Sequence, residues 1–216
     1  MTFDQEMIAI NEEIEKMFSL TREYLRRSLV YYLSDESIVF DTKIDDHLVN
    51  DCERNVEAWC LSILLREKVY ATDLRRVTGC LKLVTDIERI GDHARDIKED
   101  ADKIKVLGEK GQDKDLIQEF VDYVLKMYDD SVKAFVRFDF KLAEEIAAQD
   151  NEVDSKVDAI LDQLIKENSE KKVSGAYVVY QTLIIKYLER IVDHAVNIAE
   201  WVVFIKNGFH KDSVII

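Results

Sequence analysis

The chain has 216 residues and a formal net charge of −14, and 47% of its residues are apolar. This apolar content is enough for a buried core, whereas the excess of carboxylates disfavours binding to nucleic-acid phosphates and to anionic lipid, because both require clustered Lys and Arg. Glycine occurs six times and proline is absent, a composition that favours long helices over many short strands. We therefore expect an all-α protein.

The first half of the chain has the pattern of three helices. Apolar residues recur at helical spacing over residues 3–33 and 37–69, and a third helix is expected from "TDLRRV" to about residue 106. Thr72 or Asp73 is predicted to cap this third helix, because both side chains can accept hydrogen bonds from the free N–H groups at a helix start.

A linker is predicted at "LGEKGQDKD", which holds two of the six glycines between charged residues. After it the helical pattern returns, with helices expected over residues 116–138, 140–167 and 175–206. These boundaries predict two tandem units, residues 1–107 and 114–216, each a three-helix bundle.

The N-terminal segment, the most apolar windows and the cysteines indicate where in the cell the protein is found. The segment "MTFDQEMIAINEEIEKM" is acidic and lacks the basic and apolar regions of a signal peptide. The most apolar windows, "AYVVYQTLIIKYL" and "AVNIAEWVVFI", fall short of the roughly 20 residues that a spanning helix needs. The three cysteines lack the paired short spacing of a zinc site, so we expect buried reduced thiols. Together these features predict a cytoplasmic protein with no transmembrane segment.

Two related stretches lie in the last predicted helix of each half. They are "DIERIGDHARDI" at residues 86–97 and "YLERIVDHAVNI" at residues 187–198, offset by 101 residues. Their apolar residues follow helical spacing, which predicts that each stretch buries one face. The offset itself indicates an internal repeat of a three-helix unit.

Each stretch also holds a Glu and an Asp four residues apart. Residues at this spacing lie on the same face of a helix, so Glu88 stacks with Asp92 and Glu189 with Asp193. A like-charge pair of this kind costs a few tenths of a kcal/mol in an isolated helix. Helix stability therefore does not explain why the pair occurs twice.

Helix-hairpin geometry brings more oxygen ligands to each pair. If the second and third helices are antiparallel about a turn near residue 70, Asp46 lies opposite Asp92 and Asn50 lies opposite Glu88. Converging carboxylates raise one another's pKa or require a cation. Oxygen ligands favour magnesium, manganese or iron over zinc.

The second hairpin repeats this arrangement. There Asp150 lies opposite Asp193 and Asp154 lies opposite Glu189, which gives four acids. The alternative is an ordinary solvated acidic face balanced by Arg89 and Arg190. Because the facing sets are duplicated, we favour cation binding.

The histidines and the remaining motifs do not indicate an enzyme. His93 and His194 each follow an Asp directly, point about 100° away from it around the helix, and are expected to be structural. A di-iron site of the ferritin type needs Glu three residues before each His, where this chain has Ile90 and Ile191. No Gly-rich phosphate loop, nucleophile elbow or zinc-protease signature is present.

The segments "ATDLRRV", "DIERIGDHARDI" and "YLERIVDHAVNIAEWV" resemble the PhoU family over nearly the whole chain. The resemblance implies two three-helix bundles that can hold iron or zinc clusters. It also implies a regulator that restrains phosphate uptake and phosphate-starvation signalling. The implied partners are the ATPase subunit of the phosphate ABC transporter and a phosphate-sensing histidine kinase, bound at the inner face of the membrane.

Carried over to this chain, the resemblance gives two candidate metal sites. The first would use Asp46, Glu88, Asp92 and Asp96, and the second Asp150, Asp154, Glu189 and Asp193. Asn50 departs from the family pattern, in which a second acid is expected, and this weakens the first site. The rival hypotheses are a metal-dependent enzyme on a helical bundle and a purely structural protein. The sequence leaves the oligomeric state open, a homodimer included.

Overall fold

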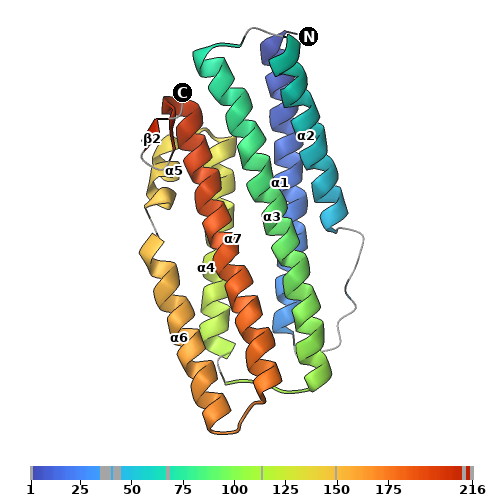
Figure 1. The fold of residues 1–216 in the computed structure, drawn as a ribbon, viewed down its shortest axis with the longest axis vertical. Helices are drawn as coiled ribbons and strands as arrows, with labels where there is room; N and C mark the ends of the chain where they lie inside the picture. The colour runs from blue at the N-terminus through green and yellow to red at the C-terminus, as the bar shows by residue number, and fades with distance from the viewer. Residues whose placement is uncertain are drawn as a thin grey trace.

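The computed structural model describes residues 2–34, 40, 45–66, 69–112, 114–148, 150–210 and 213–214, and the side chains among them except at 150–152, 209–210 and 213–214. Within these ranges the chain forms long helices and one short hairpin of strands (Figure 1). The helices are α1 (Phe3–Leu33), α2 (Asp46–Arg66), α3 (Ala71–Leu107), α4 (Lys114–Val136), α5 (Phe140–Ala147), α6 (Asp150–Ser169) and α7 (Gly175–Asn207). Strand β1 (Phe209–His210) pairs antiparallel with β2 (Ser213–Val214).

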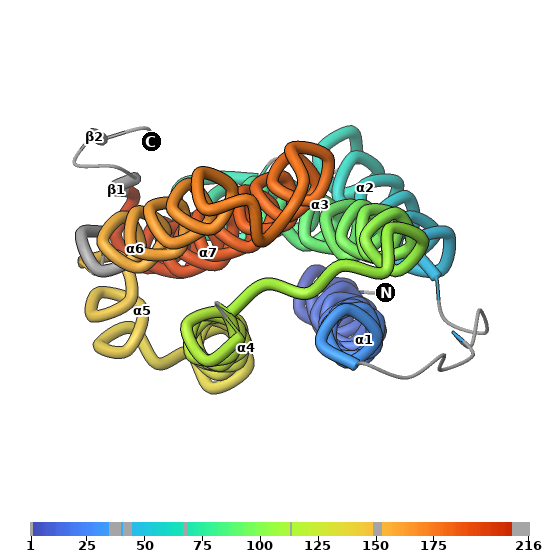
Figure 2. The backbone as a smooth tube through the Cα atoms, turned by 90° about the horizontal axis from the view of Figure 1, so that it is seen from below, coloured from blue at the N-terminus to red at the C-terminus, as the bar shows by residue number. Residues whose placement is uncertain are grey.

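Helices α3 and α7 lie side by side at the centre of the molecule (Figure 1). Helices α1 and α2 pack against α3, and α4, α5 and α6 pack against α7. Seen from the lower end, α1 and α4 form one layer, and α2, α3, α7 and α6 form the other (Figure 2). The predicted all-α architecture of two tandem helical bundles is confirmed. None of the helices in the described ranges is long and apolar enough to cross a membrane.

Helix boundaries follow local capping chemistry. Helix α1 starts at a capping box, in which the Thr2 hydroxyl accepts from the Gln5 amide and the Gln5 side chain accepts from the Thr2 amide. The prediction that Thr72 or Asp73 caps α3 is wrong. The amide of Asp73 already donates to the carbonyl of Tyr70, so the first helical turn begins earlier, and Tyr70 is the N-cap without a side-chain bond.

The single helix predicted over residues 140–167 is two helices, α5 and α6. The amide of Ala148 bonds the carbonyl of Ile146, which interrupts the helical ladder. Position 150 follows the buried residues Ala143 and Ile146 by seven and four residues, so a continuous helix would place an aspartate on the buried face. A continuous helix would therefore require the burial of a carboxylate, which is unfavourable.

Helix α2 is shorter than predicted, since it begins at Asp46 and ends at Arg66. Residues 37–39, 41–44 and 67–68 of the predicted helix lie outside the described residues. The three cysteines are buried free thiols, as predicted. Burial raises the pKa of Cys52 to about 11 and that of Cys60 to about 12, so both stay protonated at neutral pH.

The contact between α3 and α7 is very close at one glycine. A Cβ atom added to Gly79 would lie 2.4 Å from Cγ1 and 2.8 Å from Cδ1 of Ile205. At Gly91 the nearest atom would be Cγ1 of Val49, at an ordinary contact distance of 3.4 Å. The absence of a side chain at Gly79 therefore permits the approach of the two central helices.

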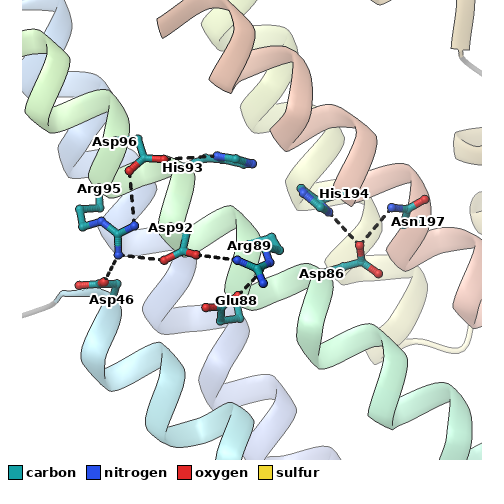
Figure 3. A network of polar contacts seen from close by, with 10 residues as sticks. All are labelled: Asp46, Asp86, Glu88, Arg89, Asp92, His93, Arg95, Asp96, His194 and Asn197. Atoms are coloured by element: carbon teal, nitrogen blue, oxygen red, sulfur yellow. Dashed lines mark hydrogen bonds and ion pairs between the residues drawn. The ribbon is translucent and has the colours of Figure 1, made fainter. Parts of the chain in front are cut away.

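A polar cluster holds the same two helices together further along. Asp86 on α3 accepts hydrogen bonds from His194 Nδ1 at 2.8 Å, Asn197 Nδ2 at 3.1 Å and Trp201 Nε1 at 3.0 Å, all on α7. Figure 3 shows Asp86 pointing across to His194 and Asn197. One carboxylate thus satisfies three partly buried groups of the other repeat. We call this set the Asp86 cluster.

The two glycines give a matched stability test. Gly91→Ala is expected to be neutral or to stabilise by up to about 1 kcal/mol, because alanine favours the helix and the space is available. Gly79→Ala is expected to lose about 1–2 kcal/mol, because the new methyl group overpacks against Ile205. Urea unfolding measures both. In an Ile205→Ala background the penalty of Gly79→Ala should disappear, and an unchanged penalty would contradict the steric explanation.

Asp86 and Asp129 both bond a side chain of the other repeat, and we expect them to contribute differently to the free energy of unfolding. Asp86→Ala leaves three donors without their acceptor and is expected to cost about 2–4 kcal/mol of unfolding free energy. Asp129→Ala removes the ion pair with Arg22, at 2.6 Å, which lies at the surface and should cost at most about 1 kcal/mol. The midpoints of urea unfolding compare the two variants, provided that the dependence of the unfolding free energy on urea concentration is unchanged. Equal losses would mean that the Asp86 cluster is not a main link between the repeats.

Candidate functional site

The acidic residues of the first predicted site gather around an arginine. Arg95 on α3 donates to Asp46 at the start of α2, to Asp92 at 2.9 Å and to Asp96 at 3.4 Å (Figure 3). Asp46 is only 8% exposed, so a compensating charge matters there. The convergence of these three carboxylates follows from the hairpin of α2 and α3, but the positive charge among them belongs to the protein.

A second arginine continues this network. Arg89 donates to Asp92 at 3.1 Å and lies 3.5 Å from Glu88 (Figure 3). Both oxygens of Asp92 are therefore bonded to guanidinium groups, one oxygen to Arg89 and the other to Arg95. The solvated-face alternative named Arg89 as a balancing charge, and here it fills that role.

The same face of the hairpin also holds groups whose charge is less well compensated. Burial, followed by the charges of Glu88 and Glu57, raises the pKa of Glu53 to about 7. Burial and the charge of Asp92 raise the pKa of Glu88. Asn50, one turn from Asp46 on α2, has a buried Oδ1 atom with no hydrogen-bond partner in the described structure. These oxygen groups suit a hard cation chemically.

The second predicted site is more open. Glu189 on α7 forms an ion pair with Lys186, while Asp193 on α7 and Asp154 on α6 are exposed. The side chain of Asp150 lies outside the described residues, so its predicted position opposite Asp193 is not described. Across the described part of the chain, no three or more His, Cys, Asp or Glu side chains are grouped so that they could hold a metal ion.

The two motif histidines occupy the boundary between the repeats. His93 stacks on Tyr187 with ring centroids 5.6 Å apart, and the centroids of the His93 and His194 rings are also 5.6 Å apart. Burial, with further contributions from His194 and Arg190, lowers the pKa of His93 to about 4. A neutral, stacked His93 and a His194 bonded to Asp86 are both packing groups.

Sequence reasoning missed Arg95, Asp86 and Glu53. A signal for Arg95 was available, because it follows Asp92 by three residues, a spacing at which opposite charges pair on a helix. Glu53, one turn beyond Asn50 on α2, lies close to Thr85 and Glu88 of α3. Asp86 had no local signal, since its three partners lie more than 100 residues away in the sequence.

Comparisons with known proteins agree with this architecture. The family model described as the PhoU domain matches the chain twice, at residues 14–101 and 117–202. A phosphate-specific transport system accessory protein PhoU homolog from Pseudomonas putida is 30% identical over 95% of this chain and 81% of its own length. A homolog with the same description from Clostridium acetobutylicum is 29% identical over 97% of this chain and 96% of its own length.

Solved structures show the same fold. The crystal structure of PhoU from Pseudomonas aeruginosa superposes with a TM-score of 0.90 at 29% identity, covering 96% of this chain and all of that one. A regulatory protein PhoU from Streptococcus pneumoniae superposes with a TM-score of 0.83 at 22% identity, over 98% of this chain and all of that one. With two matched PhoU domains and a relative that is 30% identical over 95% of the sequence, the chain belongs to the PhoU family.

Proposed function

We propose that this protein is a cytoplasmic regulator that restrains the phosphate ABC transporter through its ATPase subunit and restrains the phosphate-sensing histidine kinase. The observation that carries the proposal is the doubled PhoU domain in a chain whose full-length relatives are named accessory proteins of phosphate-specific transport systems. The net charge of −14 suits protein partners better than nucleic acid. Long helices linked by the Asp86 cluster would supply a rigid docking surface.

A deletion strain tests this function. Without the protein, high-affinity phosphate uptake and the starvation response should stay active in phosphate-rich medium, because the restraint on the transporter and kinase is lost. Phosphate uptake by washed cells and a starvation-responsive reporter measure the two effects. Growth under phosphate limitation is the control, because wild type and deletion should then match.

Complementation sharpens the experiment. The wild-type gene should restore low uptake in phosphate-rich medium. If the deletion strain lacks any paralogue and still matches wild type in rich medium, the proposed regulatory role is wrong. Pull-down of the ATPase subunit and of the kinase from phosphate-replete cells distinguishes a direct restraint from an indirect one.

We also propose that the acidic face of the α2–α3 hairpin binds a divalent cation in competition with Arg95. The support is the set of oxygen groups on this hairpin, which comprises Asp92, Glu88 and the buried Oδ1 of Asn50 that has no hydrogen-bond partner in the described structure. Magnesium, manganese, iron and zinc are the candidate ions, and oxygen ligands favour the first three. A bound cation would supply the charge that Arg95 supplies here. At the second site, the ion would compete with Lys186 for Glu189.

Arg95→Gln tests this competition. The variant leaves Asp46 and Asp92 without a full positive partner, so the chelator-treated protein should melt lower, and Mn²⁺ should raise its melting temperature more than that of wild type. A hundredfold excess of ion over Kd corresponds to about 2.7 kcal/mol of stabilisation. Thermal melts with and without Mn²⁺ measure the effect.

Arg22→Gln is the matched control, because it removes the same charge from an ion pair with the single carboxylate of Asp129, away from the α2–α3 hairpin. Its Mn²⁺ response should equal that of wild type. Glu88→Gln combined with Asp92→Asn should abolish the response of the first site. Equal Mn²⁺ shifts in wild type, Arg95→Gln and the double variant would show that this acidic face is not a cation site.

A further inference from the structure

Helix α2 carries two large apolar side chains on its solvent-exposed side. Leu61 is 53% exposed and Leu65 is 87% exposed, and they lie one turn apart near the C-terminal end of the helix. The helix lies at the edge of its layer and packs against α1 and α3, so much of its surface faces solvent (Figure 2). A single exposed leucine is ordinary on a protein surface, but two on successive turns form a continuous apolar surface.

Two glutamates continue this surface towards the N-terminal end of α2. Glu53 and Glu57 precede Leu61 by eight and four residues, so the four side chains follow one i, i+4 row of the helix. The row extends over about 18 Å, or about three helical turns. We call these four residues, Glu53, Glu57, Leu61 and Leu65, the α2 stripe.

The glutamates of the α2 stripe lie in a negatively charged environment. Glu53 is partly buried beside Glu88 of α3, and its pKa is raised by this burial and by the charges of Glu88 and Glu57. The neighbouring Arg54 forms an ion pair with Asp51. Within the part of the chain that the structure describes, neither Glu53 nor Glu57 forms an ion pair. This end of the stripe therefore attracts a positively charged group.

The second repeat shows that a helix at this position does not need the leucines. At the 101-residue offset, the positions of Leu61 and Leu65 hold Asp162 and Lys166 of α6, and both are exposed. The cores of the two helices correspond at this offset, since the following residues are buried in both: Cys52, Val56 and Ile63 on α2, and Val153, Val157 and Leu164 on α6. The two acids of the row are kept as aspartates. The apolar pair is thus particular to the first repeat.

A basic amphipathic helix fits the α2 stripe in shape and charge. Exposed i, i+4 rows pack into the grooves of a neighbouring helix. Apolar side chains of such a helix would cover Leu61 and Leu65, and its basic side chains would lie near Glu53 and Glu57. The glutamates repel an anionic lipid surface, and a second copy of the stripe would bring the same acids. Charge complementarity therefore selects a basic partner.

We propose that the α2 stripe docks a basic amphipathic helix of a partner protein. Apolar side chains of the partner bury Leu61 and Leu65, and its Lys or Arg side chains pair with Glu53 and Glu57. The inference rests on the proposed regulatory function, because it supplies that function with a surface for a protein partner. Docking is measured on the purified protein, so its failure would leave the outcome of the deletion strain unaffected.

Fluorescence anisotropy with a labelled peptide tests the docking. The probe is a peptide of about 20 Leu, Lys and Ala residues, with leucines along one face of the helix and lysines along the other. In buffer with chelator, it should bind the full chain about tenfold or more tightly than a scrambled peptide of the same composition, which lacks an apolar face. Equal affinity of the two peptides would reduce the binding to net charge and overturn the proposal.

Leu61→Asp combined with Leu65→Lys gives α2 the residues that α6 has at the equivalent positions. The two changes leave the net charge unchanged, and α6 is a folded helix with the same residues. The affinity for the peptide should fall by about tenfold or more, because the apolar contact is lost. Unfolding curves check that the variant is folded.

Val179→Asp combined with Leu183→Lys is the matched control. It makes the same chemical change at two exposed apolar residues one turn apart on α7, and it should leave the affinity unchanged. Unchanged affinity in the α2 variant, or an equal loss in the α7 variant, would place the binding elsewhere and contradict the proposal.

Glu53→Gln combined with Glu57→Gln tests the charged end of the stripe. Binding of the peptide should weaken several-fold and become less sensitive to salt, because two ion pairs are lost. Glu144→Gln combined with Glu145→Gln removes the same charge from exposed positions of α5 and should keep the wild-type affinity. If both pairs of changes weaken binding equally, the overall charge is the cause and the proposal is wrong.

Two further measurements address the other occupants of the α2 stripe. Flotation with vesicles of phosphatidylcholine and phosphatidylglycerol measures binding to lipid, and sedimentation velocity of the protein alone measures self-association. We expect neither to depend on the stripe. Association with vesicles or with a second copy that is lost in the Leu61→Asp, Leu65→Lys variant would assign the stripe to that occupant and overturn the proposal.

Discussion

The close pairing of α3 with α7 is the constraint on which the rest of the structure depends. It requires the missing side chain at Gly79, where Ile205 fills the space, and the carboxylate of Asp86, which bonds three groups on the facing helix. Because these two helices are the last helix of each repeat, the other helices pack around them. The residues of the first motif therefore lie on two faces of α3. Ile87, Ile90 and Ala94 are buried in the core, whereas Glu88 and Asp92 lie on the side of α3 that is next to α2.

The repeat is symmetric in position and different in chemistry. Asp86 on α3 meets His194 on α7, and the residues at the 101-residue offset, Tyr187 on α7 and His93 on α3, meet each other in the same contact. One pair is a hydrogen bond and the other a ring stack. The stack buries His93 and lowers its pKa, whereas the bonded pair holds a carboxylate between the repeats. Each motif histidine thus packs at the contact between α3 and α7. The Asp that precedes it points about 100° away around the helix, and therefore away from this contact.

Sequence periodicity was sufficient for the helices, the repeat and the pairing of α2 with α3, because burial of one helix face leaves a regular pattern. It was insufficient for Arg95, since a long side chain reaches across its own helix and its neighbour, and spacing alone does not show which carboxylates it meets. It also missed the break before α6, where no glycine or proline marks the end. The predicted cap at Thr72 or Asp73 failed because it rested on residue type without the backbone bond that defines the start of a helix.

The protein keeps its two unusual charge environments apart. Carboxylates gather on the outer face of the α2–α3 hairpin, where Arg89 and Arg95 compensate them, whereas lysines gather at the bundle end beside the segment that joins α3 to α4. At physiological ionic strength, exposed charges separated by more than about 8–10 Å are largely screened, so a net charge of −14 is compatible with a local group of lysines. Helix α3 carries both environments, with Asp92 and Arg95 in its middle and Lys105 in its last turn. Both charge environments therefore lie on the helix that contacts α7 at Gly79 and Asp86.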